Sequence, residues 1–232
     1  MVCMVISTRT TQIFGYCRPD STHVQHLRSV SVSCISDIAD WMKCNRLQLN
    51  SSKTEFLWCS SSRRVEKLDQ NHLAIGTDAV KPKNEVRDLG LFLDSDLSMR
   101  SHITGLVRTS FGILRQLRSV SRSLTQDVTR HLVQSLILSR KDCCNIALVG
   151  LPQRSIIRLQ AVINAAARLV LRLKKFDHIT TAIQGELQWL RIGERINFKL
   201  CILVHKCLNN CAPHYLADNI RPLSDDSNRS RL

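Results

Sequence analysis

The stretch Trp41–Glu55, WMKCNRLQLNSSKTE, marks a change in hydrophobic period from that of a helix to that of a strand. Between about residues 23 and 43, apolar residues recur every three or four positions, which predicts an amphipathic helix. After that segment, Leu47 and Leu49 alternate with polar residues and are followed by two serines. This alternation predicts a strand that ends in a turn.

Short apolar runs that follow this stretch predict further strands, at residues 56–59, 73–75, 79–80 and 89–93. From Ser101 onward the period is helical, with Val128, Leu132 and Leu136 as one apolar stripe. Thr125 precedes that stripe and predicts a helix N-cap. The fold class expected is therefore α+β, in which a helix and short antiparallel strands precede an all-helical region. The predicted domains are residues 1–99, residues 100–222 and a flexible tail at 223–232.

The formal net charge of +14 is concentrated in the predicted helical region. Between Arg100 and Lys175 the chain has fourteen Arg or Lys residues and only two acidic ones. Such a block favours a polyanionic partner such as nucleic acid, because each neutralised phosphate releases condensed counterions. A solvated basic surface explains the same charge, since net charge reports association and not fold.

The ten cysteines are scattered and include no CxxC pair. A cluster of Cys201, His205, Cys207, Cys211 and His214 lies near the C-terminus, but only the spacing from Cys207 to Cys211 loosely suits zinc. No metal site is therefore expected. No apolar run is long enough to cross a bilayer, so no membrane association is expected. The cysteines indicate free thiols in a reducing intracellular compartment, either the nucleus or the cytoplasm.

Several boxes occur in an order and spacing that carry a family resemblance. They are Thr11–Phe14, Asp40–Met42, Asn45–Asn50, Lys53–Glu55, Val86–Leu91, Leu114–Arg118, Ser139–Asn145, Gly150–Pro152, Asn164–Arg168 and Leu187–Leu190. Together they resemble the palm and thumb of reverse transcriptases from LINE-type (non-LTR, jockey-like) retrotransposons, over about residues 5–220. Many relatives have Leu-Asp-Tyr-Cys-Asn where this chain has Lys-Asp-Cys-Cys-Asn at residues 141–145.

The resemblance implies that the polymerase metal site is degenerate. In the family, an Asp-Asp pair on a tight hairpin precedes Thr-Gln, and these carboxylates hold the Mg²⁺ ions of phosphoryl transfer. The aligned positions here hold Arg9 and Thr10. Arg9 adds a cation where cations should bind, and Thr10 offers only a neutral oxygen. No cofactor is therefore expected for this chain, although the intact family uses Mg²⁺.

Two roles fit each of the other palm residues. By resemblance Lys53 is the palm lysine near the triphosphate, or else a turn lysine in water. Arg87 and Asp88 either position a primer end or pair with their neighbours. The three tryptophans, Trp41, Trp58 and Trp189, are expected in the core because each lies in an apolar period.

The function expected from these observations is that of an N-terminally truncated, inactive reverse transcriptase with residual template-primer binding. The partner would be RNA or an RNA/DNA hybrid, bound weakly and without sequence specificity. The arginines expected to contact phosphates are Arg87, Arg108, Arg115, Arg118, Arg122, Arg158, Arg168 and Arg172. Two alternatives are a fragment of a longer active polymerase and a helical protein-interaction module. Exposed palm core would also favour self-association.

Overall fold

The structure is a computed structural model that describes residues 2–7, 12–18, 20–61, 68, 71–75, 78–174, 176–218 and 220. The chain divides into two compact units, residues 1–104 (unit 1) and residues 105–232 (unit 2). Arg9, Thr10 and the expected tail at 223–232 lie outside the described residues.

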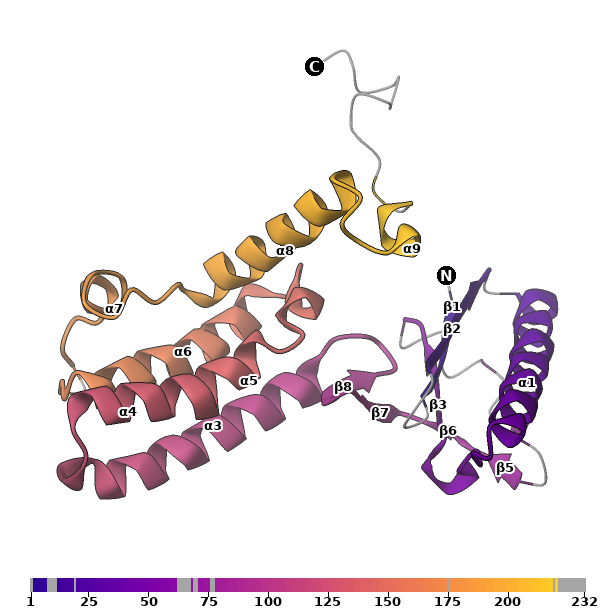
Figure 1. Ribbon diagram of the computed structural model, residues 1–232, viewed down its shortest axis with the longest axis horizontal. Coiled ribbons are helices and arrows are strands. Elements are labelled where there is room, and N and C mark those ends of the chain that lie inside the picture. Colours follow the sequence, from indigo (N-terminus) through magenta and orange to yellow (C-terminus); the bar gives the residue numbers. More distant parts are fainter. Residues whose placement is uncertain are drawn as a thin grey trace, which may run out of the picture. The chain divides into compact units, whose positions relative to one another are not determined.

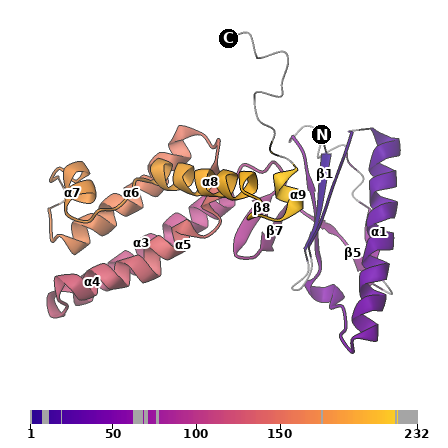
Figure 2. The same ribbon diagram turned by 45° about the horizontal axis from the view of Figure 1, so that its top comes forward.

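Unit 1 consists of short strands and one long helix (Figures 1 and 2). Its elements are β1 (Val2–Ser7), β2 (Gln12–Cys17), α1 (Ser21–Cys44), η1 (Ser51–Lys53), β3 (Glu55–Cys59), β4 (Leu73–Ile75), β5 (Asp78–Val80), β6 (Pro82–Lys83), β7 (Glu85–Asp88) and β8 (Leu91–Asp94). The main sheet has the order β2-β1-β3-β6, while β4-β5 and β7-β8 form separate antiparallel pairs. β1 is antiparallel to both of its neighbours, and β6 is parallel to β3.

The central strands β1 and β3 are apolar on both faces because both faces of the sheet are covered. Met4, Ile6, Phe56 and Trp58 belong to a cluster that also contains Val24 and Ile35 of α1. The intervening residues Val5, Leu57 and Cys59 form a second cluster with Val86 of β7. The side-chain period of two thus sends alternate residues into two different cores.

Helix α1 begins and packs as its local sequence dictates. The Asp20 carboxylate accepts a hydrogen bond from the His23 amide at 2.9 Å, which caps the helix. Hydrogen bonds from the His23 amide and ring lower the pKa of Asp20. Gly15 of β2 leaves room for Leu27 of α1, since a Cβ at that position would lie 2.5 Å from the Leu27 Cδ1.

Two expectations around Trp41–Glu55 are wrong. Trp41 is 62% exposed rather than buried, and Met42 is the buried residue of that helical turn. Residues 47–50 form no strand, because the chain bonds locally there: the Leu47 amide donates to the Met42 carbonyl and the Thr54 hydroxyl to the Asn50 carbonyl. An alternating pattern produces a strand only where a partner strand is available. Trp58 and Trp189 are buried as expected.

The described part of unit 2 is helical and uses the C-terminal part of α3 (Arg100–Val120). It also contains η2 (Ser121–Ser123), α4 (Gln126–Val133), a π-helical turn η3 (Gln134–Leu138), α5 (Ser139–Asp142), η4 (Asn145–Leu148), α6 (Gln153–Val170), α7 (Thr180–Gly185), α8 (Ile192–Leu208) and α9 (His214–Ala217). Helix α6 packs against α4 on one side and α8 on the other (Figure 1). No helix in the described ranges is long and apolar enough to span a membrane.

The expected apolar stripe of α4 is displaced by one residue. The Thr125 hydroxyl caps the helix at the Val128 amide, as expected. However, Val128 is 44% exposed, and Thr129, Val133 and Ile137 are buried instead. This stripe was not predicted from the sequence because its first residue, Thr129, is polar. The buried Thr129 hydroxyl is satisfied within the helix by the Thr125 carbonyl, at 2.9 Å.

Candidate functional site

A small cavity in unit 1 collects the expected palm residues. Its volume is about 220 Å³, and it is lined by Ser7, Lys53, Glu55, Arg87, Asp88, Leu89 and Gly90. Ser7 is the last residue of β1 and pairs with Gln12 of β2. Arg9 and Thr10 fall between these two strands in sequence and lie outside the described residues.

Hydrogen bonds and ion pairs occupy the carboxylates of this cavity. The Ser7 hydroxyl donates to the buried Asp88 carboxylate at 3.1 Å. The Glu55 carboxylate accepts hydrogen bonds from the Lys83 ammonium at 2.7 Å and from the Arg87 backbone amide at 3.3 Å. These carboxylates thus hold the ends of β1, β3 and β7 together.

The hairpin β7-β8 shapes one wall of the cavity. Its two-residue turn, Leu89-Gly90, has positive φ at both positions, 45° and 89°, the geometry that matches the twist of antiparallel strands. Arg87 is exposed and its guanidinium lies 5.7 Å from the centre of the Phe92 ring on the paired strand. This cation–π contact orients Arg87, which lines the cavity as well. Both expected roles of Arg87 are therefore compatible with its position.

The described residues of this cavity do not fit a magnesium pair. Mg²⁺ requires hard oxygen ligands, mainly carboxylates and water. Here the two carboxylates are engaged by Ser7, Lys83 and a backbone amide, and two basic side chains, Lys53 and Arg87, share the space. In the described part of the chain, no group of three or more His, Cys, Asp or Glu side chains is arranged to hold a metal ion.

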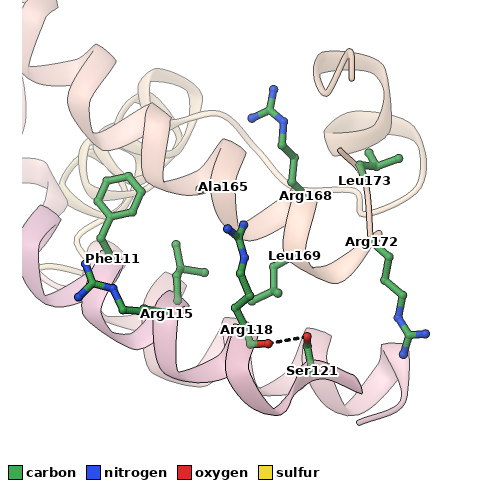
Figure 3. Close-up of a pocket in the computed structure, with 10 residues that line it drawn as sticks. Phe111, Arg115, Arg118, Ser121, Ala165, Arg168, Leu169, Arg172 and Leu173 are labelled. Carbon is green, nitrogen blue, oxygen red and sulfur yellow. Dashed lines mark hydrogen bonds between the residues drawn. The ribbon is translucent and has the colours of Figure 1, made fainter. Parts of the chain in front are cut away.

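A larger cavity in unit 2 gathers four of the eight arginines predicted to contact nucleic acid. It has a volume of about 720 Å³ and lies between α3 and the C-terminal end of α6 (Figure 3). Arg115 and Arg118 come from α3, and Arg168 and Arg172 from the other wall. Its floor includes the buried Leu114 and Leu169, and Phe111 on its rim is 40% exposed. Arg115 and Arg118 are three positions apart in α3 and share a helix face, whereas Arg172 follows the end of α6 at Val170.

The arginines of the α6 wall are held by backbone carbonyls. Arg168 donates to the Asp177 carbonyl at 3.2 Å, and its buried Nε has no hydrogen-bond partner among the described residues. Arg172 donates to the Leu124 carbonyl at 2.9 Å and has a positive φ of 54°, an uncommon conformation for a non-glycine residue. Both residues line the cavity and keep their charge, and a guanidinium with five N–H donors has donors left after one such bond.

The remaining predicted arginines are placed elsewhere. Arg108, Arg122 and Arg158 are exposed and do not line this cavity. Sequence reasoning missed Phe111 as a lining residue, since its helical spacing indicated a buried position. It also missed the burial of Lys141, which was counted among the basic residues expected at the surface.

No protein-family model matches the chain, and searches of curated proteins and of solved structures found no significant match.

Proposed function

We propose that this chain is part of a non-LTR-type reverse transcriptase that has lost polymerase activity and retains binding to RNA or an RNA/DNA hybrid. The observation that carries the binding part is the cavity between α3 and α6 with its four arginines. The reverse-transcriptase part rests on the ordered sequence boxes. The proposed palm comprises unit 1, and the proposed thumb comprises the helices of unit 2.

The arrangement of unit 1 supports the palm assignment. The family's boxes imply a hairpin for the carboxylates, then a helix, then a strand at Asn45–Asn50 before the lysine box, then a second hairpin. The chain has β1-β2, α1, η1 at the lysine box and β7-β8 in that order, although no strand forms at residues 47–50. Ser7, Lys53 and Asp88, which come from three of these segments, line one cavity. Residues that the boxes separate in sequence are thus neighbours in space.

The α3–α6 cavity supports phosphate binding by geometry and charge. Arginine is charged at all physiological pH values and donates several hydrogen bonds in a planar fork, which suits phosphate oxygens. Such contacts carry no base information, so sequence preference should be small. The exposed Phe111 ring on the rim offers a face on which an unpaired base can stack.

Loss of polymerase activity follows from the residues at the metal positions. Arg9 and Thr10 stand where two carboxylates are required. The cavity that Ser7 lines also contains Lys53 and Arg87, whose positive charges oppose the entry of divalent cations. In a primer-extension assay with Mg²⁺, the chain should yield no product. Measurable extension would contradict this part and favour a fragment of an active polymerase.

Binding is tested by fluorescence anisotropy with a labelled RNA/DNA hybrid over a range of salt concentrations. We expect binding at low salt that weakens steeply as salt rises. The double variant R115Q/R118Q removes two cations that lie on the α3 wall. It should reduce the slope of log K against log salt by about 2 and weaken binding to all sequences alike.

The matched control is R154Q, which removes an exposed arginine from the same helix as Arg168, about 20 Å along its axis. Its slope and affinity should remain those of the wild type. The binding proposal fails if the wild type does not bind at low salt. It also fails if the double variant and the control have equal effects.

Self-association of unit 1 belongs to the same proposal. Tyr16 and Trp41 are large side chains that are mostly exposed on this unit. Exposed apolar groups of this kind favour contact with a second copy. Light scattering should show a mass that increases with concentration, and W41S should reduce that increase. A constant monomer mass would count against self-association.

A further inference from the structure

Two adjacent cysteines, Cys143 and Cys144, form a pair of thiols at the surface of unit 2. Both side chains are exposed, and their Sγ atoms are 3.8 Å apart. They lie in the connection between α5 and η4. All ten cysteines lie in the described part of the chain, and none of them forms a disulfide. The proposed nucleic-acid binding uses neither Cys143 nor Cys144.

The backbone brings these two side chains together. In regular helix or strand, neighbouring side chains diverge. Here Cys143 is extended (ψ 122°) and Cys144 is left-handed (φ 56°, ψ 21°), so the chain turns between them. A left-handed cysteine is uncommon and marks a conformation that the surroundings impose.

Hydrogen bonds fix this conformation on both sides of the pair. The Cys143 amide donates to the Ser139 carbonyl at 3.1 Å, and the Cys144 carbonyl accepts the Ala147 amide at 3.0 Å. The preceding residue, Asp142, is bound to Arg195 at 2.7 Å through its carboxylate. The two thiols are therefore held close before any ligand arrives, which reduces the entropy lost on binding.

The distance between the two sulfurs suits chelation better than a disulfide. Disulfides usually join Cα atoms at least about 4.4 Å apart, whereas adjacent Cα atoms are only about 3.8 Å apart. Two thiolates that bind one tetrahedral centre at about 2.3 Å lie about 3.8 Å from each other. The observed separation of 3.8 Å therefore brings both sulfurs within reach of a single thiophilic centre.

We propose that Cys143 and Cys144 form a vicinal dithiol site that chelates one soft, thiophilic centre through both sulfurs. Trivalent arsenic with a single organic substituent is the simplest such centre, because it takes two thiolates. With phenylarsine oxide, two As–S bonds form and the arsenic–oxygen bond breaks. The oxygen leaves as water with the two thiol protons, and no atom changes its oxidation state.

The test uses the full chain and phenylarsine oxide, followed by washing with excess glutathione and measurement of intact mass. Arsenic held by one sulfur is displaced by a monothiol, whereas chelated arsenic is retained. We expect the wild type to retain one arsenical more than either C143S or C144S. The chelate should raise retention about 10²-fold over single-thiol binding, and 1,2-ethanedithiol should remove it.

The matched control is C201S, which removes an exposed cysteine from α8 and should behave as the wild type. Cys3 and Cys59 on paired strands compete poorly, since burial raises the pKa of the Cys59 thiol to about 12. Burial also raises the pKa values of Cys3 and its neighbour Cys17. Peptide mapping of the wild-type adduct should place the arsenical on the peptide with both Cys143 and Cys144. Equal retention by the wild type and both single variants would overturn the proposal, as would an arsenical mapped to another cysteine.

Discussion

Replacement of Lys141 by methionine tests how a buried amine limits the stability of unit 2. Lys141 is only 3% exposed, and its Nζ has no hydrogen-bond partner among the described residues. The pKa of its ammonium group is lowered from 10.5 to about 7, mainly by burial and secondly by the nearby Arg195, while Asp142 partly opposes both effects. Methionine has a similar volume and no charge, so K141M removes the penalty with little change in packing.

The magnitude follows from the displacement of this pKa. Each pH unit corresponds to about 1.36 kcal/mol, so carrying the proton in the folded state costs up to about 5 kcal/mol. Between pH 7 and pH 10.5 the unfolded chain binds this proton and the folded chain does not. Stability therefore rises with pH over this window, and the full penalty applies below it. K141M should be more stable than the wild type near neutral pH.

The assay is urea unfolding followed by circular dichroism, at about pH 7 and about pH 9, for the wild type and K141M. The advantage of K141M should shrink by about 2 to 3 kcal/mol between these two pH values. Because the comparison is a difference, the titration of other groups cancels. The control K206M replaces an exposed lysine on α8 and should change stability by less than about 0.5 kcal/mol. An advantage of K141M that is independent of pH, or a loss of stability at neutral pH, would refute the reasoning.

Three further substitutions give measurable outcomes. F56A removes a fully buried ring that packs edge-on to Trp58, with centroids 5.2 Å apart. It should lower the free energy of unfolding by about 3 to 5 kcal/mol, measured by urea unfolding with tryptophan fluorescence. A loss below about 1 kcal/mol would show that the core closes around the missing ring. S7A removes the hydroxyl that donates to the buried Asp88 carboxylate and should lower the free energy of unfolding by about 1 to 3 kcal/mol. An unchanged midpoint of urea unfolding would mean that other contacts satisfy Asp88. Burial lowers the pKa of His102 below 6.5, so the folded state resists its protonation and stability is lost as pH falls below 6.5. The melting temperature of H102L should therefore fall less with decreasing pH than that of the wild type. Equal pH dependence of the two melting temperatures would rule out this contribution.

Local sequence signals located many elements of the fold correctly. The period of three to four predicted α1, and the apolar run at 56–59 predicted β3. The apolar run at 89–93 predicted a strand, and β8 (Leu91–Asp94) lies there. The signals for these elements lie in neighbouring residues, through side-chain period, capping and turn preferences. Such signals are complete within a short window of sequence.

Signals that depend on a distant partner failed. Residues 47–50 alternate but do not form a strand, and Trp41 is exposed. The buried stripe of α4 begins at Thr129, whose hydroxyl donates a hydrogen bond to the Thr125 carbonyl within the helix. Lys141 was counted with the surface charges although the surrounding helices enclose it. In each case, burial depends on contacts between segments far apart in the chain.

The sequence by itself determined the α+β class, the concentration of positive charge after Arg100 and the carboxyl-free residues at Arg9 and Thr10. Only the tertiary structure decided which basic residues act together. It placed Arg115 and Arg118 around one cavity with Arg168 and Arg172, which lie fifty or more positions further along the chain. Net charge depends only on composition, whereas a binding surface requires basic residues that lie close together in space. The fold provides this by bringing α3 and the C-terminal end of α6 to the same cavity.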